Sequence, residues 1–141
     1  MCELYRWADG ICNGHSFLIY YDLFKPLQDA ITGDYQMMCD LNDREHPGSW
    51  KKNWFPVFNE SHDWWVQALR KVPQPRAPMI HYYLVGGEPE VKYRSFTDMM
   101  SIWADCYEGG AFSVDDRGGL EEDTTRFEAI HRSFPRRRRR T

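Results

Sequence analysis

The chain has 141 residues, of which 42% are hydrophobic and 16% aromatic, and its formal net charge is −3. This length suits one domain with a single core, and the apolar content excludes global disorder. No apolar run approaches the roughly 20 residues of a membrane-spanning helix, and the N-terminus lacks the features of a signal peptide, so we expect a cytoplasmic protein.

The first part of the chain alternates helical and extended patterns. Apolar spacing and a closing glycine predict the end of a helix over residues 3–10, and aromatic and β-branched residues predict a strand over 17–21. Pro26 suits the first position of a second helix, which we expect Gly33 to interrupt before residues 35–41 resume it. The apolar residues expected along this helix are Leu27, Ala30, Ile31, Tyr35, Met38 and Leu41.

The middle of the chain contains extended segments joined by short connections. We expect strands over residues 54–58, 64–69, 79–85 and 90–93, and the last two form a hairpin. Pro56 favours an edge or irregular position for the first strand, because proline cannot donate a hydrogen bond to a neighbour. Short connections favour antiparallel pairing over a series of parallel crossovers.

Two helices and a short strand are expected toward the C-terminus. Ser95 suits an N-cap before a helix over residues 96–107, whose apolar residues recur at helical spacing until Gly109 and Gly110 end it. We interpret the stripe of Met99, Met100 and Trp103 as core. The apolar residues at helical spacing are Phe96, Met99, Met100, Trp103, Ala104 and Tyr107. A short strand and turn over 111–120 precede a final helix over 125–134, which Pro135 should end.

Together these elements predict the α+β class, with a central, largely antiparallel sheet packed by helices. We expect a single domain over residues 1–135 and a disordered basic tail over 136–141. The tail contains Arg136, Arg137, Arg138, Arg139 and Arg140. Without these five arginines, 13 Lys and Arg face 21 Asp and Glu, which leaves a net charge of −8 on the body. An acidic body favours basic partners.

The adjacent pair Trp64 and Trp65 raises the question of which aromatic residues are available for binding. Successive side chains of a strand point to opposite faces, so these two rings must oppose each other. We expect most aromatic residues between Trp50 and Trp65 to belong to the core. The outward-facing member of the pair is a candidate for partner contact, since tryptophan is enriched among binding hot spots.

Several segments taken in order resemble the SMI1/KNR4 family, also called the SUKH superfamily. The resemblance covers residues 3–135 and is carried by LYRWADG, WKKNWFPVF, DWW, YRSFTDMMSIWADCYEGG and GGLEEDTTRFEAIHRSFP. It implies an α+β fold and a non-enzymatic, protein-binding role. Bacterial members of the family look like immunity proteins that neutralise toxins, many of them nucleases, so a toxin domain is the implied partner.

The densest acidic group is the second candidate for partner contact. It consists of Asp115, Asp116, Glu121, Glu122 and Asp123. A solvated acidic loop is the simplest reading, and a contact patch for a basic partner is the functional one, because carboxylates can take the place of nucleic-acid phosphates and speed association. As a pair for sugar hydrolysis they would need a defined separation across a cleft.

Other chemistry has little support from the spacing of residues. The five histidines form no HExxH or HxH pattern, and the cysteines Cys2, Cys12, Cys39 and Cys106 form no CxxC pair, so we expect no metal, cofactor or catalytic group. The basic tail could contact nucleic acid, and this remains an alternative function. A carboxylate-based hydrolase is the other alternative.

Overall fold

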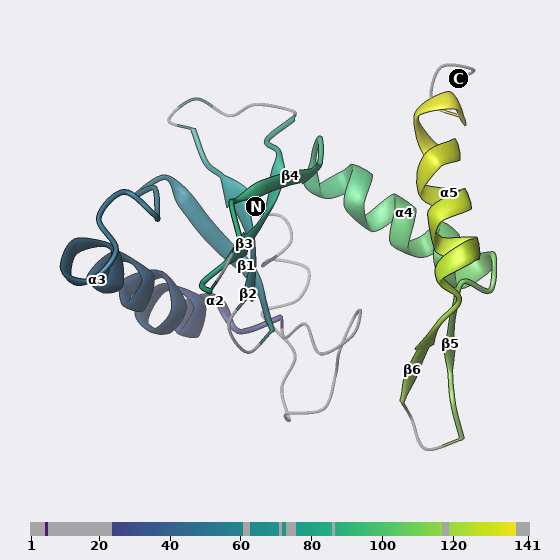
Figure 1. Ribbon diagram of the computed structural model, residues 1–141, viewed down its shortest axis with the longest axis horizontal. Helices are drawn as coiled ribbons and strands as arrows, with labels where there is room; N and C mark the ends of the chain where they lie inside the picture. The colour runs from purple at the N-terminus through teal and green to yellow at the C-terminus, as the bar shows by residue number, and fades with distance from the viewer. Residues whose placement is uncertain are drawn as a thin grey trace. The chain divides into compact units, whose positions relative to one another are not determined.

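The computed structural model describes residues 5, 24–60, 63–70, 72, 76–85, 87–116 and 119–137, with only the backbone of residues 60 and 135–137 (Figure 1). The chain divides into two compact units, Met1–Phe96 and Thr97–Thr141. The predicted helix over 3–10 and strand over 17–21 lie almost wholly outside the described residues. The prediction of one domain over residues 1–135 stays a prediction.

The first unit contains one continuous helical segment with a widened centre. It comprises α2 (Leu27–Asp29), the π-helix η1 (Ala30–Tyr35) and α3 (Gln36–Arg44). The helix begins one residue after Pro26, whose carbonyl accepts the Ala30 N–H at 2.9 Å. The expected interruption at Gly33 is wrong, because the chain passes through this glycine in the wider π-helical turns instead of breaking.

One side of this helical segment is buried. Ala30, Asp34 and Met38 face inward, whereas Leu27 and Ile31 are 36% and 42% exposed. Of the apolar residues expected along this helix, Leu27 and Ile31 therefore do not share the buried face of Ala30. The buried side chains recur at every fourth residue through η1. The buried carboxylate of Asp34 is satisfied by Lys25, whose Nζ lies 2.7 Å away.

The first unit also contains a four-stranded sheet. Its strands β1 (Trp54–Glu60), β2 (Asp63–Ala68), β3 (Met79–Tyr83) and β4 (Glu90–Tyr93) follow each other in space in the order β1-β2-β3-β4, and every pair is antiparallel. The predicted meander is confirmed. Pro56 lies beside a register shift in β1, which has β2 as its one neighbour among the described strands, as expected for proline in a sheet.

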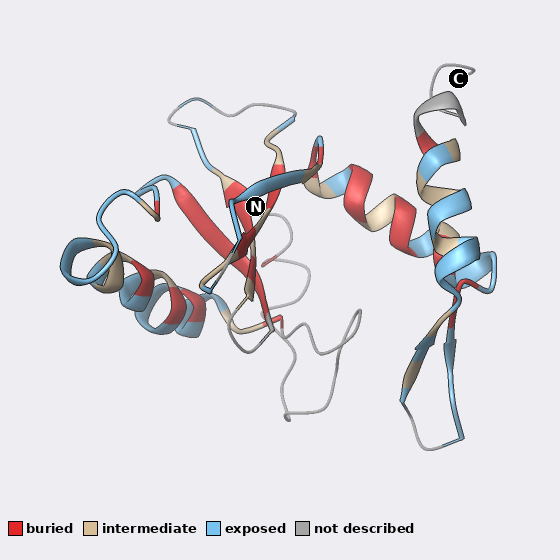
Figure 2. Ribbon diagram, viewed as in Figure 1, coloured by how far each residue is buried: buried red, intermediate tan, exposed pale blue. Residues whose placement is uncertain are grey.

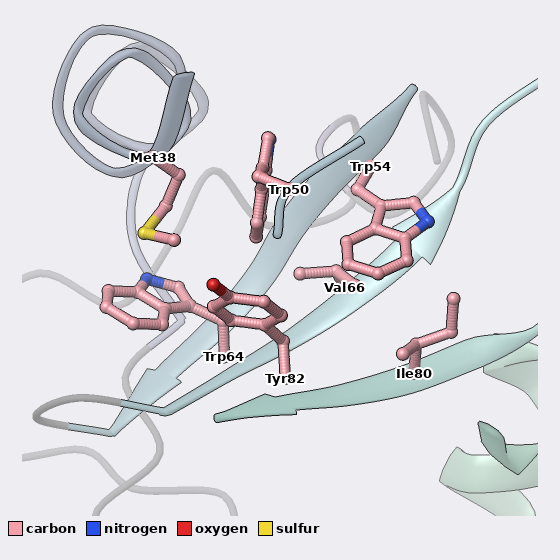
Figure 3. Close-up of a cluster of buried hydrophobic side chains, with 7 residues drawn as sticks. All are labelled: Met38, Trp50, Trp54, Trp64, Val66, Ile80 and Tyr82. Atoms are coloured by element: carbon pink, nitrogen blue, oxygen red, sulfur yellow. The ribbon is translucent and has the colours of Figure 1, made fainter. Parts of the chain in front are cut away.

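Helix α3 packs on one face of this sheet through a buried aromatic cluster (Figure 3). The cluster consists of Met38, Trp50, Trp54, Trp64, Val66, Ile80 and Tyr82. Trp50 meets Trp54 and Tyr82 edge-on at centroid distances of 5.7 and 5.3 Å, an arrangement that aromatic rings favour. A four-stranded antiparallel sheet packed by a helix confirms the predicted α+β class.

The second unit begins at the second residue of α4 and contains the rest of that helix, a hairpin and a final helix. Its elements are α4 (Phe96–Glu108), β5 (Phe112–Val114), β6 (Leu120–Glu122) and α5 (Thr124–Arg137). The end of α4 was predicted correctly: Gly110 adopts a φ of 67°, and the Ala111 N–H donates to the Cys106 carbonyl at 2.8 Å, which together close the helix.

Two expectations for these helices are wrong. On α4, Ile102 and Cys106 are buried while Ala104 and Tyr107 are exposed, so the inward stripe is shifted from the predicted one (Figure 2). The backbone of α5 continues through Pro135 to Arg137. The φ of proline is compatible with a helix, and proline lacks only one hydrogen-bond donor. The last turn of α5 therefore includes Pro135, and the helix ends two residues later. Residues 138–141 lie outside the described part of the chain.

Candidate protein-binding surfaces

The five carboxylates of the acidic group lie on and beside the β5–β6 hairpin of the second unit. The hairpin forms a narrow ribbon that extends away from α5 (Figure 1). Phe112 pairs with Glu122, and Ser113 pairs with Glu121. Because neighbouring side chains of a strand point to opposite faces, Glu121 and Glu122 lie on opposite faces of the ribbon. The acidic group is therefore not one flat patch.

Two members of the acidic group stabilise the local fold. An Asp115 carboxylate oxygen accepts the Gly119 N–H at 2.6 Å and so closes the turn. Asp123 is the N-cap of α5, because its Oδ1 accepts the Arg126 N–H at 3.0 Å and its Oδ2 lies 3.1 Å from the Arg126 guanidinium. Their carboxylates are already occupied by backbone donors.

The remaining three members differ in their exposure. Glu122 is half-buried, and its Oε2 has no hydrogen-bond partner among the described residues. Asp116 and Glu121 are exposed (Figure 2). Two members of the acidic group are therefore best placed to meet a partner. They are Asp116 at the turn and Glu121 on one face of the ribbon.

The two tryptophans of β2 lie on opposite faces of the sheet, as their positions in the strand predicted. Trp64 is 2% exposed and belongs to the core cluster, so its choice as a contact residue is wrong. Trp65 is half-buried on the other face. Its ring stacks on His81 of β3 at 4.4 Å and meets Tyr93 of β4 at 5.6 Å. Trp65 is therefore the candidate contact of the pair.

Four rings from three strands form what we call the Trp65 ladder, which comprises Trp65, His81, Tyr83 and Tyr93. The His81 and Tyr83 rings are 4.3 Å apart. The His81 Nε2 lies 3.9 Å from an Asp63 carboxylate oxygen. Burial lowers the pKa of His81, and the nearby Asp63 carboxylate partly opposes this effect. The ladder is therefore a row of half-buried rings around the buried Tyr93, and burial disfavours the charged form of its histidine.

The ladder as a whole was not predicted from the sequence. The sequence does show which of these residues share a face of their own strand. Asp63 and Trp65 are two positions apart, as are His81 and Tyr83, so each pair lies on one face of its strand. Which residue of β3 lies opposite Trp65 depends on the register, which the alternation alone does not define.

A pocket of about 650 Å³ lies in the first unit between the segment after α3 and the β3–β4 connection. Lys51 at this pocket lies over the Trp54 ring, with Nζ 5.2 Å from the ring centroid. The pocket is lined by His46, Pro47, Gly48, Ser49, Lys51, Trp54, Ile80, Tyr82, Tyr83, Leu84, Gly87, Glu88, Pro89 and Val91. None of the five carboxylates of the acidic group lines it.

Catalytic and metal-binding chemistry finds little support in the described part of the chain. No three His, Cys, Asp or Glu side chains there come together as a possible metal site. Cys39 and Cys106 are free thiols, and burial raises the pKa of Cys106 to about 11, so this thiol is protonated and a poor nucleophile. Within the same residues, no helix is long and apolar enough to cross a membrane.

Comparison of the sequence with models of known protein families and with curated proteins gave no match. The resemblance to the SMI1/KNR4 family therefore stays a prediction.

Proposed function

We propose that the protein is a non-enzymatic binding domain that acts in the cytoplasm as an immunity protein and neutralises a cognate toxin by occluding it. The observation that carries this proposal is the pair of exposed carboxylates, Asp116 and Glu121, on a narrow ribbon of an acidic protein. Carboxylates presented in this way attract a basic surface, and the active face of a nuclease is basic because it binds phosphates.

The Trp65 ladder supplies a second contact candidate of a different kind. It lies in the first unit, whereas the acidic ribbon lies in the second, so each is tested by its own variants. Aromatic side chains contribute to affinity when a partner covers them, whereas exposed carboxylates mainly accelerate association. The two surfaces therefore predict different kinetic changes.

The direct test is co-purification with the product of the adjacent gene, together with rescue of cells that express this product. A tight complex and rescue are expected. The variant Asp116→Asn/Glu121→Gln should associate about tenfold or more slowly at low salt, and the difference should shrink as salt rises. Trp65→Ala should instead mainly accelerate dissociation.

The matched control removes the same charge elsewhere. Glu45→Gln/Glu108→Gln changes one exposed carboxylate in each unit outside the ribbon, and it should associate nearly as fast as the wild type. If the intact protein neither binds nor rescues, the immunity function is wrong. If both double variants slow association equally, overall charge and not the ribbon attracts the partner.

A further inference from the structure

Strand β4 is the last strand of the sheet and has one described neighbour, β3. Alternate backbone N–H and C=O groups of such an edge strand point away from the sheet and can pair with another extended chain. In the middle of β4, Val91 is 60% exposed, although it pairs with the buried Ile80 of β3. An exposed apolar side chain on an open edge favours an additional strand.

The charged residues before Val91 are acidic and those after it are basic, so two antiparallel copies of this segment would place opposite charges across from each other. Residues 88–94 read EPEVKYR. Glu90 and Lys92 lie one position before and after Val91, and Glu88 and Arg94 lie three positions before and after it. In an antiparallel pair of two copies that is symmetric about Val91, Glu90 of each copy lies opposite Lys92 of the other. Glu88 and Arg94 flank the strand, which spans Glu90–Tyr93 and whose register with β3 shifts beside Val91. Opposite charges directly across two strands stabilise their pairing.

The side chains of β4 are already arranged for this pairing. Lys92 Nζ lies 2.6 Å from Glu90 Oε2, so both charges lie on the same side of the strand. Two copies would form a row of four alternating charges there. Val91 points to the other face, where it lines the 650 Å³ pocket with Ile80 and Pro89. Val91 of a second copy would continue this apolar row.

We propose that the protein forms a homodimer in which β4 pairs antiparallel with β4 of a second copy, with the two-fold axis at Val91. The two sheets then form one continuous sheet. A lysine on an edge strand often prevents such pairing, because its charge is left without a partner. Here the glutamate two residues earlier supplies that partner in the symmetric register. The proposal requires no toxin and goes beyond the proposed function.

The first test is the oligomeric state of the purified full chain by sedimentation or light scattering. A short strand interface is expected to dissociate in the micromolar range, so concentrations from about 5 µM to about 500 µM cover the transition. Wild type should change from monomer to dimer. Glu90→Lys and Lys92→Glu should each weaken dimerisation at least about tenfold, because each places like charges opposite each other. Glu45→Lys, an equal charge reversal outside the strand, should dimerise like the wild type.

The second test restores the complementarity. The single variants Glu90→Lys and Lys92→Glu should dimerise when they are mixed, since every charge then meets its opposite. The double variant Glu90→Lys/Lys92→Glu should dimerise alone, and this remains informative if a single variant folds poorly. A wild type that stays monomeric, single variants that dimerise undiminished, or a mixture and double variant that stay monomeric would each overturn the proposal.

Discussion

The indole of Trp65 stacks on the imidazole of His81, its cross-strand partner, with ring centroids 4.4 Å apart and an interplanar angle of 12°. This contact holds His81 on the surface of the sheet with its side chain only 16% exposed. A partly buried imidazole is poorly compensated when it is protonated, because the Asp63 carboxylate oxygen lies 3.9 Å away. The stack therefore links the candidate binding surface to pH.

The first prediction concerns acid sensitivity. The folded protein lowers the pKa of His81 below its ordinary value of 6.5, so the unfolded state binds more protons at mildly acidic pH. The free energy of unfolding should therefore decrease as the pH falls through this value. His81→Phe keeps an aromatic ring in the stack and removes the titration. Thermal unfolding from about pH 8 to about pH 5 should show a smaller loss for this variant.

Asp63 provides the control for this prediction. Its carboxylate partly opposes the lowering of the His81 pKa, so Asp63→Asn should increase the acid sensitivity that depends on His81. The double variant Asp63→Asn/His81→Phe should show no such increase. Parallel pH curves for wild type and His81→Phe would mean that the buried imidazole does not contribute to the pH dependence.

The second prediction separates the two tryptophans of β2. Trp64→Ala leaves a cavity in the buried cluster and should lower the free energy of unfolding by about 3 to 5 kcal/mol. Trp65→Ala removes a half-buried ring and should lower it by about 1 to 2 kcal/mol. Urea unfolding followed by circular dichroism measures both without relying on tryptophan fluorescence. Equal losses would contradict the assignment of Trp64 to the core and Trp65 to the surface.

The third prediction divides the acidic group by role. Asp123→Ala removes the N-cap of α5 and should lower the free energy of unfolding by about 1 kcal/mol. Asp116→Ala, at an exposed position, should change it by less than about 0.5 kcal/mol. Chemical denaturation gives both values. Partner affinity should follow the opposite order, and a large stability loss for Asp116→Ala would show that this carboxylate is structural.

The fourth prediction contrasts two glycines. Gly110 has a φ of 67°, so Gly110→Ala strains the end of α4 and should lower the free energy of unfolding by about 1 kcal/mol. A Cβ at Gly33 would meet nothing within 4 Å, so Gly33→Ala should raise it by about 0.4 to 1 kcal/mol. Thermal melts of the two variants test this. A destabilising Gly33→Ala would mean that the π-helical turns need glycine.

Much of the secondary structure could be predicted from local patterns. The strands were found because alternation and turn residues act within a few positions, and Pro56 marked the irregular edge strand correctly. The inward stripe of α4 could not be placed as well. Met99, Ile102, Trp103 and Cys106 are buried, but the neighbouring apolar residues of this helix allow a second, overlapping stripe. Tertiary packing selects between such stripes.

The sequence by itself determined the α+β class, the opposition of Trp64 and Trp65, and the charges around Val91, since each depends on residue type and short-range periodicity. Only the tertiary structure decided that Trp64 is the buried one and that Trp65 meets His81. These relationships depend on which strands pair and in which register. Register arises from contacts between residues that are far apart along the chain, and no local pattern specifies it.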